Sequence, residues 1–176
     1  LCIESILSKT TYPNYEIIVV DNSSDDGTGD YLKELSGIFD FIKPVYNKEN
    51  LGFAKAVNQG VGLAKGYYIL FLNNDVVVTR GWLSRMLNYL DRLPEIGLLG
   101  PVTNACSNEA KIETDYKDLD AMEDFANKYT SGREGIAFDI KTLALFCAAT
   151  TMKVIEDIGL LDERFETGMF EDDDIS

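Results

Sequence analysis

The sequence predicts an α/β fold with a mostly parallel central sheet flanked by helices in three layers. Strand-like and helix-like segments alternate through the first hundred residues, which favours right-handed βαβ units. The strand-like segments at 16–20 and 68–72 are largely apolar, and each is followed at once by polar residues, as expected of buried strands in a parallel sheet. Ligands of open α/β folds bind at the carboxyl edge of the sheet, so these polar residues are the first candidates for a site.

The spacing of apolar residues predicts the other elements in turn. Residues 1–9 have the pattern of the end of a helix, with Ile3, Ile6 and Leu7 on one face. Residues 103–135 are polar and weakly patterned, and no element is predicted there. Further helices are expected after the first strand through Leu35 and at 52–64, 80–91 and 152–158, and further strands at 41–46, 96–101 and 142–150.

Length and composition indicate a globular protein. A chain of 176 residues with a 45% hydrophobic share is about one domain, so we expect a single domain over residues 1–176. The chain begins without Met, which indicates an excised piece of a longer protein. No apolar run approaches the ~20 residues that span a bilayer, and no signal peptide is visible, so no transmembrane segment is expected.

Charge and residue usage exclude several kinds of site. The net charge of −14 argues against nucleic acid and anionic membrane surfaces as partners. The chain has no histidine, which excludes Ser-His and Cys-His catalysis and the usual zinc sites. Cys2, Cys106 and Cys147 form no CxxC pair, and a reducing, cytoplasmic setting fits them best.

The polar triplet Asn73, Asn74 and Asp75 ends the second apolar run. One carboxylate and two amides at a strand end suit Mg²⁺ or Mn²⁺ carrying a phosphate, because these ions prefer oxygen ligands. The alternative is an ordinary Asn/Asp turn after a strand.

The loop at 21–28 follows the first apolar run and permits several interpretations. An EF-hand is excluded because Lys33 stands where the twelfth ligand should be Glu. A dinucleotide-binding loop is weakly supported, because the third glycine is missing and acidic side chains would repel a pyrophosphate. A base- and ribose-binding loop remains, since carboxylates and amides accept from imide and hydroxyl donors, and so does a turn that caps the next helix.

Two further stretches carry candidate groups. Residues 50–60 combine Gly52 with Lys55 and Asn58 on one helix face, which suits a phosphate or a base edge but equally a solvated polar face. Residues 171–174 are four consecutive acids between Phe170 and Ile175. Such a run is usually a solvated face, but crowding raises the pKa of a carboxylate and can produce a general base.

Taken together, these motifs resemble glycosyltransferase family 2, the inverting nucleotide-sugar transferases with the GT-A fold. The resemblance runs from about Leu1 to the last residue, in the family's order and spacing. It is carried by two nucleotide-binding segments, a DxD-type metal motif and an acceptor-side loop with the catalytic acids: residues 12–24, residues 50–53 with Asn58, residues 71–75, and residues 159–165 followed by 170–174.

The resemblance implies transfer of a sugar, with inversion, from a UDP-, dTDP- or GDP-sugar to a hydroxyl of a glycan or lipid-linked acceptor. It implies Mg²⁺ or Mn²⁺ as cofactor and a place in cell-surface polysaccharide or glycan synthesis. The parent protein is then expected in the cytoplasm at the inner face of a membrane, associated peripherally.

Roles for the site residues follow from the same resemblance. Asp172 would be the catalytic base, with Asp174 as the next candidate, and Glu171 would orient the acceptor or Asp172. Asp75, helped by Asn73 and Asn74, would hold the metal. Asp21 would accept from the base of the nucleotide, and the rest of the nucleotide pocket would be shaped by Asn50, Gly52, Lys55 and Asn58.

The chain departs from the family pattern in two respects. Its metal motif contains one certain carboxylate, Asp75, and it lacks the family's first strand and the acceptor-side helices after Ser176, which predicts a fragment of a GT-A catalytic domain. One rival is a non-catalytic nucleotide-sugar-binding module, against which the acids at Asp75 and Asp172 argue. Another is a nucleotidyltransferase, which usually has a Gly-rich basic loop at its N-terminus that this chain lacks.

Overall fold

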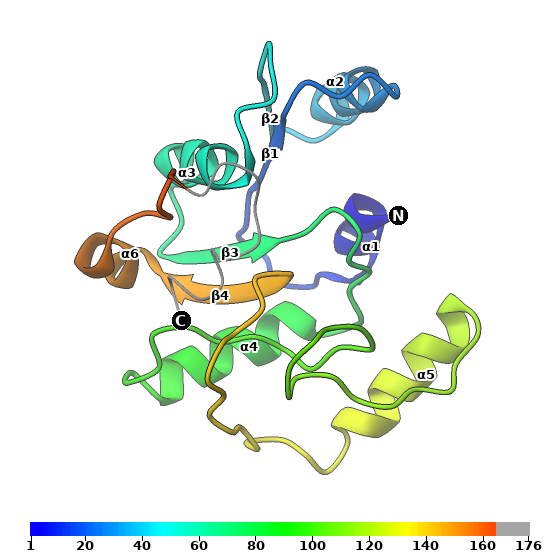
Figure 1. The fold of residues 1–176 in the computed structure, drawn as a ribbon. Coiled ribbons are helices and arrows are strands. Elements are labelled where there is room, and N and C mark those ends of the chain that lie inside the picture. The colour runs from blue at the N-terminus through cyan, green and yellow to red at the C-terminus, as the bar shows by residue number, and fades with distance from the viewer. Residues whose placement is uncertain (165–176) are drawn as a thin grey trace. The chain divides into compact units, whose positions relative to one another are not determined.

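The computed structural model describes residues 1–164, which form two compact units (Figure 1). The first unit contains Leu1–Tyr12 and Leu70–Thr150, and the second contains Pro13–Ile69 and the described chain from Thr151 on. Strands and helices alternate as predicted, and the α/β class is confirmed. The elements are α1 (Cys2–Lys9), β1 (Ile17–Asp21), α2 (Thr28–Ile38), β2 (Ile42–Tyr46), α3 (Phe53–Leu63), β3 (Tyr68–Leu72), α4 (Trp82–Arg92), α5 (Leu119–Thr130), β4 (Cys147–Thr151) and α6 (Met152–Ile158).

The second unit is built on a parallel pair of strands. β1 and β2 pair in register from Ile17 opposite Ile42 to Asp21 opposite Tyr46, and α2 connects them. α3 packs on β1, and a Cβ added at Gly60 would be in ordinary van der Waals contact with Cγ2 of Val20, at 3.7 Å. This is the βαβ arrangement that the alternating pattern predicts, and it brings the chain after β1 and the chain after β2 to one edge.

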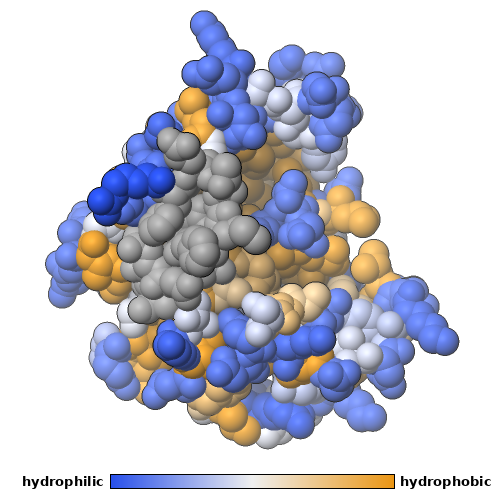
Figure 2. Space-filling view, viewed as in Figure 1, coloured by the Kyte–Doolittle hydropathy of each residue, from blue (hydrophilic) through white to orange (hydrophobic). Residues whose placement is uncertain are grey.

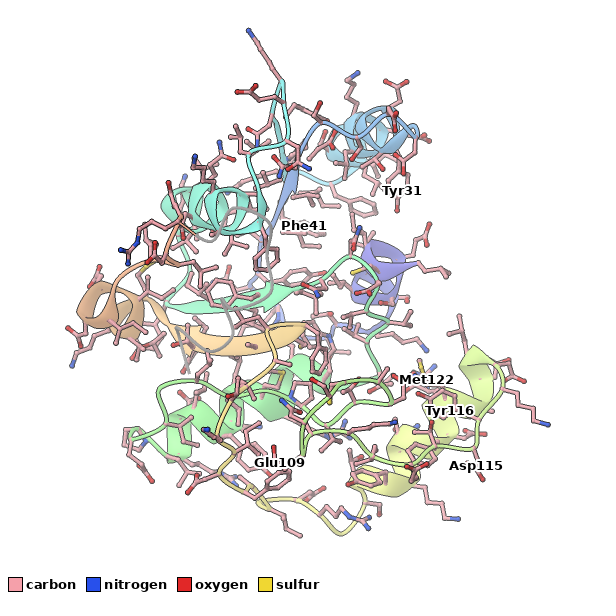
Figure 3. The ribbon with its side chains drawn as sticks, in the orientation of Figure 1. Tyr31, Phe41, Glu109, Asp115, Tyr116 and Met122 are labelled. Carbon is pink, nitrogen blue, oxygen red and sulfur yellow. The ribbon has the colours of Figure 1, made fainter. Side chains whose placement is uncertain are left out.

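Side chains of several kinds secure this parallel pair. Phe41, labelled in Figure 3, has its ring centroid 5.2 Å from that of Tyr15 and 5.5 Å from that of Phe39. Leu32 is the buried residue of α2, whose viewed face is otherwise largely hydrophilic in Figure 2. An amphipathic helix with one narrow buried stripe fits a position on the outside of a sheet.

β3 and β4 form a second sheet, and they run antiparallel. The N–H of Asn73, just after β3, donates to the carbonyl of Phe146, just before β4 (2.9 Å). At the other end the N–H of Met152 donates to the carbonyl of Tyr67 (2.8 Å). Burial alternates along β3, with Ile69 buried and its neighbours half-buried, so the strand is less enclosed than its continuous apolar sequence predicts.

The prediction of a strand at 96–101 is wrong, because only one residue of this segment pairs with another strand. Leu99 forms an isolated antiparallel bridge with Ala149, through hydrogen bonds of 2.9 and 2.7 Å. The pairing stops there because Pro101 has no N–H to donate. Gly100 also leaves room for the side chain of Leu143, whose Cδ1 would lie 2.9 Å from a Cβ at that position. The strand predicted at 142–150 accordingly begins only at Cys147.

The first unit contains the one described helix that the sequence did not predict. α4 has the expected stripe, with Leu83, Met86, Leu87 and Leu90 buried. α5 lies in the segment that appeared featureless, and Figure 3 labels Met122 on it and Tyr116 before it. Its first turn is capped by Asp118, whose carboxylate accepts from the N–H of Ala121 at 2.8 Å.

Aromatic contacts and one buried acid hold α5, in place of a regular apolar stripe. Tyr116 packs edge-on against Phe125 at 5.5 Å between centroids, and Phe125 stacks on Tyr129 at 5.9 Å. Glu123 is the buried residue of the helix. A helix whose buried residue is an acid lacks the apolar periodicity from which helices are predicted.

Candidate active site

Asp21 ends β1 and is buried, with 8% of its surface exposed. Its Oδ1 accepts from the N–H of Ser24 at 2.9 Å, which closes a turn of the kind expected of Asp after a strand. Ser23 within this turn has φ 72°, which is uncommon for a residue with a side chain. Asp26 binds the N–H of Thr28 at 3.1 Å. The loop thus contains both the capping turn and a carboxylate at the sheet edge, and the base-binding interpretation remains a prediction.

Asn22, the next residue, joins the loops that follow β1 and β2. Its Nδ2 donates to Oδ1 of Asn50 (2.8 Å) and to the carbonyl of Gly52 (3.2 Å). Its Oδ1 accepts from the N–H of Leu51 (3.0 Å) and from Nδ2 of Asn47 (3.1 Å). Both ends of one amide therefore hold the two loops together.

Asn47 extends this set of contacts to α3. Asn47 and Gln59 exchange two side-chain hydrogen bonds, of 2.8 and 3.1 Å. We refer to Asn22, Asn47, Asn50 and Gln59 as the amide network. Sequence reasoning placed only Asn50 at the site, although the signal for the others was visible: amides follow two strands that end at one edge of a parallel pair.

Asn50 and Gly52 form the turn that begins α3. Oδ1 of Asn50 also accepts from the N–H of Gly52 at 2.9 Å. Gly52 has φ 87° and ψ 169°, a conformation that is essentially restricted to glycine. Lys55 lies exposed in the first turn of the same helix. The structure therefore combines the amino end of a helix with a nearby cation, an arrangement suited to a phosphate.

Asn58 lies deeper in α3 and is buried, with 8% of its surface exposed. Its Nδ2 donates to the carbonyl of Leu161 (2.9 Å) and to Oε1 of Glu163 (3.1 Å). Its Oδ1 accepts from the N–H of Leu161 (3.1 Å). These bonds engage both ends of the amide and join α3 to the loop after α6, whereas the sequence predicts a contact with the nucleotide.

Asn73, Asn74 and Asp75 follow β3 in the first unit. Asn74 and Asp75 are exposed, and within residues 1–164 no hydrogen bond or ion pair engages the Asp75 carboxylate. The pKa of the nearby Cys2 thiol is raised, chiefly by burial, and the charge of Asp75 adds to the rise. Asp75 is therefore an exposed carboxylate whose oxygens bind no other group among the described residues.

The donor set of this triplet fits a hard divalent cation. One carboxylate and two amide oxygens are the ligand types that Mg²⁺ and Mn²⁺ take, and such ions are often held by one carboxylate together with phosphate oxygens. The described part of the chain contains no group of three or more His, Cys, Asp or Glu residues that could hold a metal.

The predicted catalytic residues Glu171 and Asp172 lie outside the described residues. The chain leading towards them is described to Arg164, whose guanidinium pairs with the carboxylate of Asp162. That hydrogen-bonded cation lowers the pKa of Asp162. The roles of Glu171 and Asp172 remain predictions.

Comparison with solved structures identifies the fold. The chain superposes on GalNAc-T7, solved with UDP, GalNAc and Mn²⁺, with a TM-score of 0.70 and 16% identity over 99% of this chain and 36% of that one. It superposes on the mannosyltransferase PcManGT from Pyrobaculum calidifontis, in complex with GDP-Man and Mn²⁺, with a TM-score of 0.67 and 20% identity over 98% of this chain and 44% of that one. The fold is the GT-A fold of glycosyltransferases.

The sequence then identifies the family. The model of glycosyl transferase family 2 matches residues 1–159, and the chain belongs to this family. It is 28% identical to the glycosyltransferase AglE of Haloferax volcanii over 169 residues, which cover 95% of this chain and 52% of that protein. Matches to two bacterial relatives cover 30% and 34% of their lengths, so the chain spans about half or less of its curated relatives.

Within residues 1–164 no helix is both long and apolar enough to cross a bilayer.

Proposed function

We propose that the protein transfers a sugar from a nucleotide diphosphate donor to an acceptor hydroxyl, with inversion at the anomeric carbon. The observation that carries the proposal is the amide network, which fixes the Asp21 loop and the Asn50–Gly52 turn to one another at the carboxyl edge of the parallel pair. Nucleotide ligands of α/β folds bind at such an edge. Membership of family 2 supports the reaction type.

In this proposal the donor nucleotide is bound by groups of the second unit. Asp21 accepts from the N–H of the base, because a carboxylate can only accept. Lys55 and the amino end of α3 attract the phosphates. Asn50 and Gly52 shape the pocket through the turn that they form. The fold relatives were solved with UDP and with GDP-Man, which supports a nucleoside diphosphate sugar as donor.

Asp75, with Asn73 and Asn74, would hold Mg²⁺ or Mn²⁺ on the diphosphate. When bound, the metal acts as a Lewis acid that neutralises charge on the leaving group. Both fold relatives were solved with Mn²⁺, which supports a divalent ion. The contribution of the chain is to present one open carboxylate at a strand end.

Transfer itself is assigned to the acids after Arg164. Asp172 takes the proton of the acceptor hydroxyl while that oxygen forms a bond to the anomeric carbon and the bond to the diphosphate breaks on the opposite face. Glu171 orients the acceptor or Asp172. A positioned base of this kind contributes about 10²–10⁴-fold to the rate. The assignment is supported by the position of these residues in the family motif.

The acceptor class and the compartment belong to the same proposal. We assign a glycan or lipid-linked acceptor, in cell-surface polysaccharide or glycan synthesis, on the basis of the family. Cys2, Cys106 and Cys147 are all free thiols, which is in keeping with a reducing cytoplasmic compartment.

The test uses the full-length protein, titrated calorimetrically with UDP, dTDP and GDP in Mn²⁺ and in EDTA, and assayed for transfer. Asp75→Ala should abolish the metal-dependent part of nucleotide binding. Asp172→Asn should leave nucleotide binding unchanged and reduce transfer by about 10²–10⁴-fold.

Asp157→Ala removes an exposed carboxylate of α6 and should match the wild type in both assays. Wild-type turnover in Asp172→Asn would show that another group is the base. Nucleotide-sugar binding by a wild-type protein that transfers nothing would favour the non-catalytic binding module instead.

A further inference from the structure

Residues 73–81 connect β3 to α4 and include Asp75; this metal-binding segment is hydrogen-bonded to α1. The thiol of Cys2 donates to the carbonyl of Asn73 at 3.4 Å. The hydroxyl of Ser5 accepts from the N–H of Val78 at 3.1 Å, in a buried hydrogen bond. The spacing of Cys2 and Ser5 places both on one face of α1. Backbone groups on both sides of Asp75 are therefore fixed by the same helix.

Glu123 of α5 holds the same segment two residues further on. Its Oε1 accepts from the N–H of Arg80 at 3.0 Å. Its Oε2 pairs with Nζ of Lys9, the last residue of α1, at 2.9 Å. Both carboxylate oxygens of Glu123 are thus engaged, one by the backbone N–H of Arg80 and one by Lys9 of α1.

This ion pair is largely shielded from water. The side chain of Glu123 is 11% exposed and that of Lys9 is 27% exposed. Burial alone would raise the pKa of Glu123, but the hydrogen bonds from Lys9 and from the N–H of Arg80 outweigh it and lower the pKa below its usual value. Removing one partner of a buried ion pair is strongly destabilising, because it leaves an uncompensated charge. The Glu123 carboxylate therefore depends on the Lys9 ammonium and on the N–H of Arg80.

We infer that Glu123 is a positioning residue for the metal-binding segment. Together with Lys9, Glu123 fixes the backbone at Arg80. Because α1 also fixes the backbone at Asn73 and Val78, Asp75 between them is held in one geometry. The inference rests on the metal role proposed for Asp75. Glu123 is not a ligand, because its oxygens are already bonded within the first unit.

The expected consequence is a higher metal affinity. A segment that is already ordered loses less conformational freedom when it binds an ion. Partners that orient metal ligands typically change metal affinity 10–100-fold when they are mutated. Glu123→Gln keeps an oxygen for Arg80 but places an amide N–H₂ against the Lys9 ammonium, so it should weaken the segment without emptying the site.

The experiment measures Mn²⁺ affinity of the full-length protein by electron paramagnetic resonance of the free ion, with UDP or GDP present. Glu123→Gln should weaken Mn²⁺ binding about tenfold and Glu123→Ala more. Nucleotide affinity in EDTA should stay at the wild-type value. Hydrogen exchange should show loss of protection at the N–H of Arg80. Lys9→Met, which leaves the carboxylate in place, should weaken Mn²⁺ binding in the same direction.

Asp124→Asn is the matched control, since it removes an exposed negative charge from the adjacent position of α5. It should bind Mn²⁺ as the wild type does. Wild-type Mn²⁺ affinity in folded Glu123→Gln and Lys9→Met variants would overturn the inference while leaving the function of Asp75 intact. Absence of Mn²⁺ binding by the wild-type protein would overturn the metal proposal and this inference together.

Discussion

The two candidate ligand-binding regions are held in different ways. In the second unit, the loops after β1 and β2 are joined by neutral amides, with Asn22 at the centre. In the first unit, the segment after β3 is held by an ion pair between two helices, Lys9 of α1 and Glu123 of α5. Asn22 lies 28 residues from Asn50 in the sequence, whereas Glu123 lies 114 residues from Lys9.

This contrast separates two sources of order. Neutral amide hydrogen bonds near the surface contribute about 1 kcal/mol each and do not titrate. A buried ion pair depends on the charge of both partners and on pH. The stability of the second unit should therefore fall on amide substitution but change little with acid at these contacts. The order of the segment after β3 should fall both on substitution of Lys9 or Glu123 and in acid.

The largest effect is expected at Asn58, where the amide contacts of the second unit are most deeply buried. Asn58→Ala leaves the N–H and carbonyl of Leu161 without partners, which should lower the free energy of unfolding by about 1–3 kcal/mol. Nucleotide affinity should not change, because the Asn58 amide is already engaged. Urea unfolding and nucleotide titration measure the two quantities.

Asn14→Ala, at an exposed asparagine of the same unit, is the control for this substitution. Asn58→Asp should be worse than alanine, since it sets two carboxylates against one another, and adding Glu163→Gln should restore part of the loss. A fall in nucleotide affinity at unchanged stability would instead place Asn58 in the nucleotide pocket, as the sequence predicts.

An intermediate effect is expected at Asn22. Asn22→Asp keeps the oxygen that accepts from Leu51 but removes the donor to Asn50 and Gly52. We expect a loss of about 1 kcal/mol of stability and a several-fold weaker nucleotide affinity, in Mn²⁺ and EDTA alike. Asn14→Asp adds the same charge at an exposed site, and an equal loss in that variant would show that charge rather than the amide network is responsible.

The smallest effect is a difference in pH dependence. The folded-state pKa of Glu123 lies below its ordinary value of 4.5, so its stabilisation is present above pH 4.5 and is lost as pH falls through the lowered folded pKa. The stability difference between wild type and Glu123→Gln should therefore shrink as pH falls below 4.5. The difference for Asn22→Ala should change little over the same range, and unfolding curves at several pH values measure both. Parallel behaviour of the two variants would contradict the distinction between a titrating and a neutral contact.

Much of the fold could be predicted because local pattern and packing agree. The apolar stripe of α4 buries the residues that its spacing indicates, and β3 forms where its apolar run predicts a strand. The strand expected at 96–101 failed because Gly100 and Pro101 end the pairing after Leu99. The orientation of β4 against β3 depends on contacts between distant segments, and no local pattern encodes it.

The candidate site was predictable as residue types but not as contacts. Asp21 and Asp75 stand out because polar residues directly follow strands. Asn58 is predicted from the sequence to shape the nucleotide pocket, yet its amide bonds to Leu161, which is 103 residues away. Glu123 gave no signal at all, because one acid among several in a polar helix reveals neither its burial nor its partner Lys9.

The hydrogen bond that the N–H of Arg80 donates to Glu123 has a consequence for protein engineering. Residues 103–135 have little sequence pattern, which makes them an obvious segment to exchange between relatives when new transfer specificities are sought. The same segment supplies the carboxylate that supports the chain beside Asp75. We therefore expect chimaeras to keep their metal response only where the grafted segment retains an acid at position 123 and the host retains a cation at position 9.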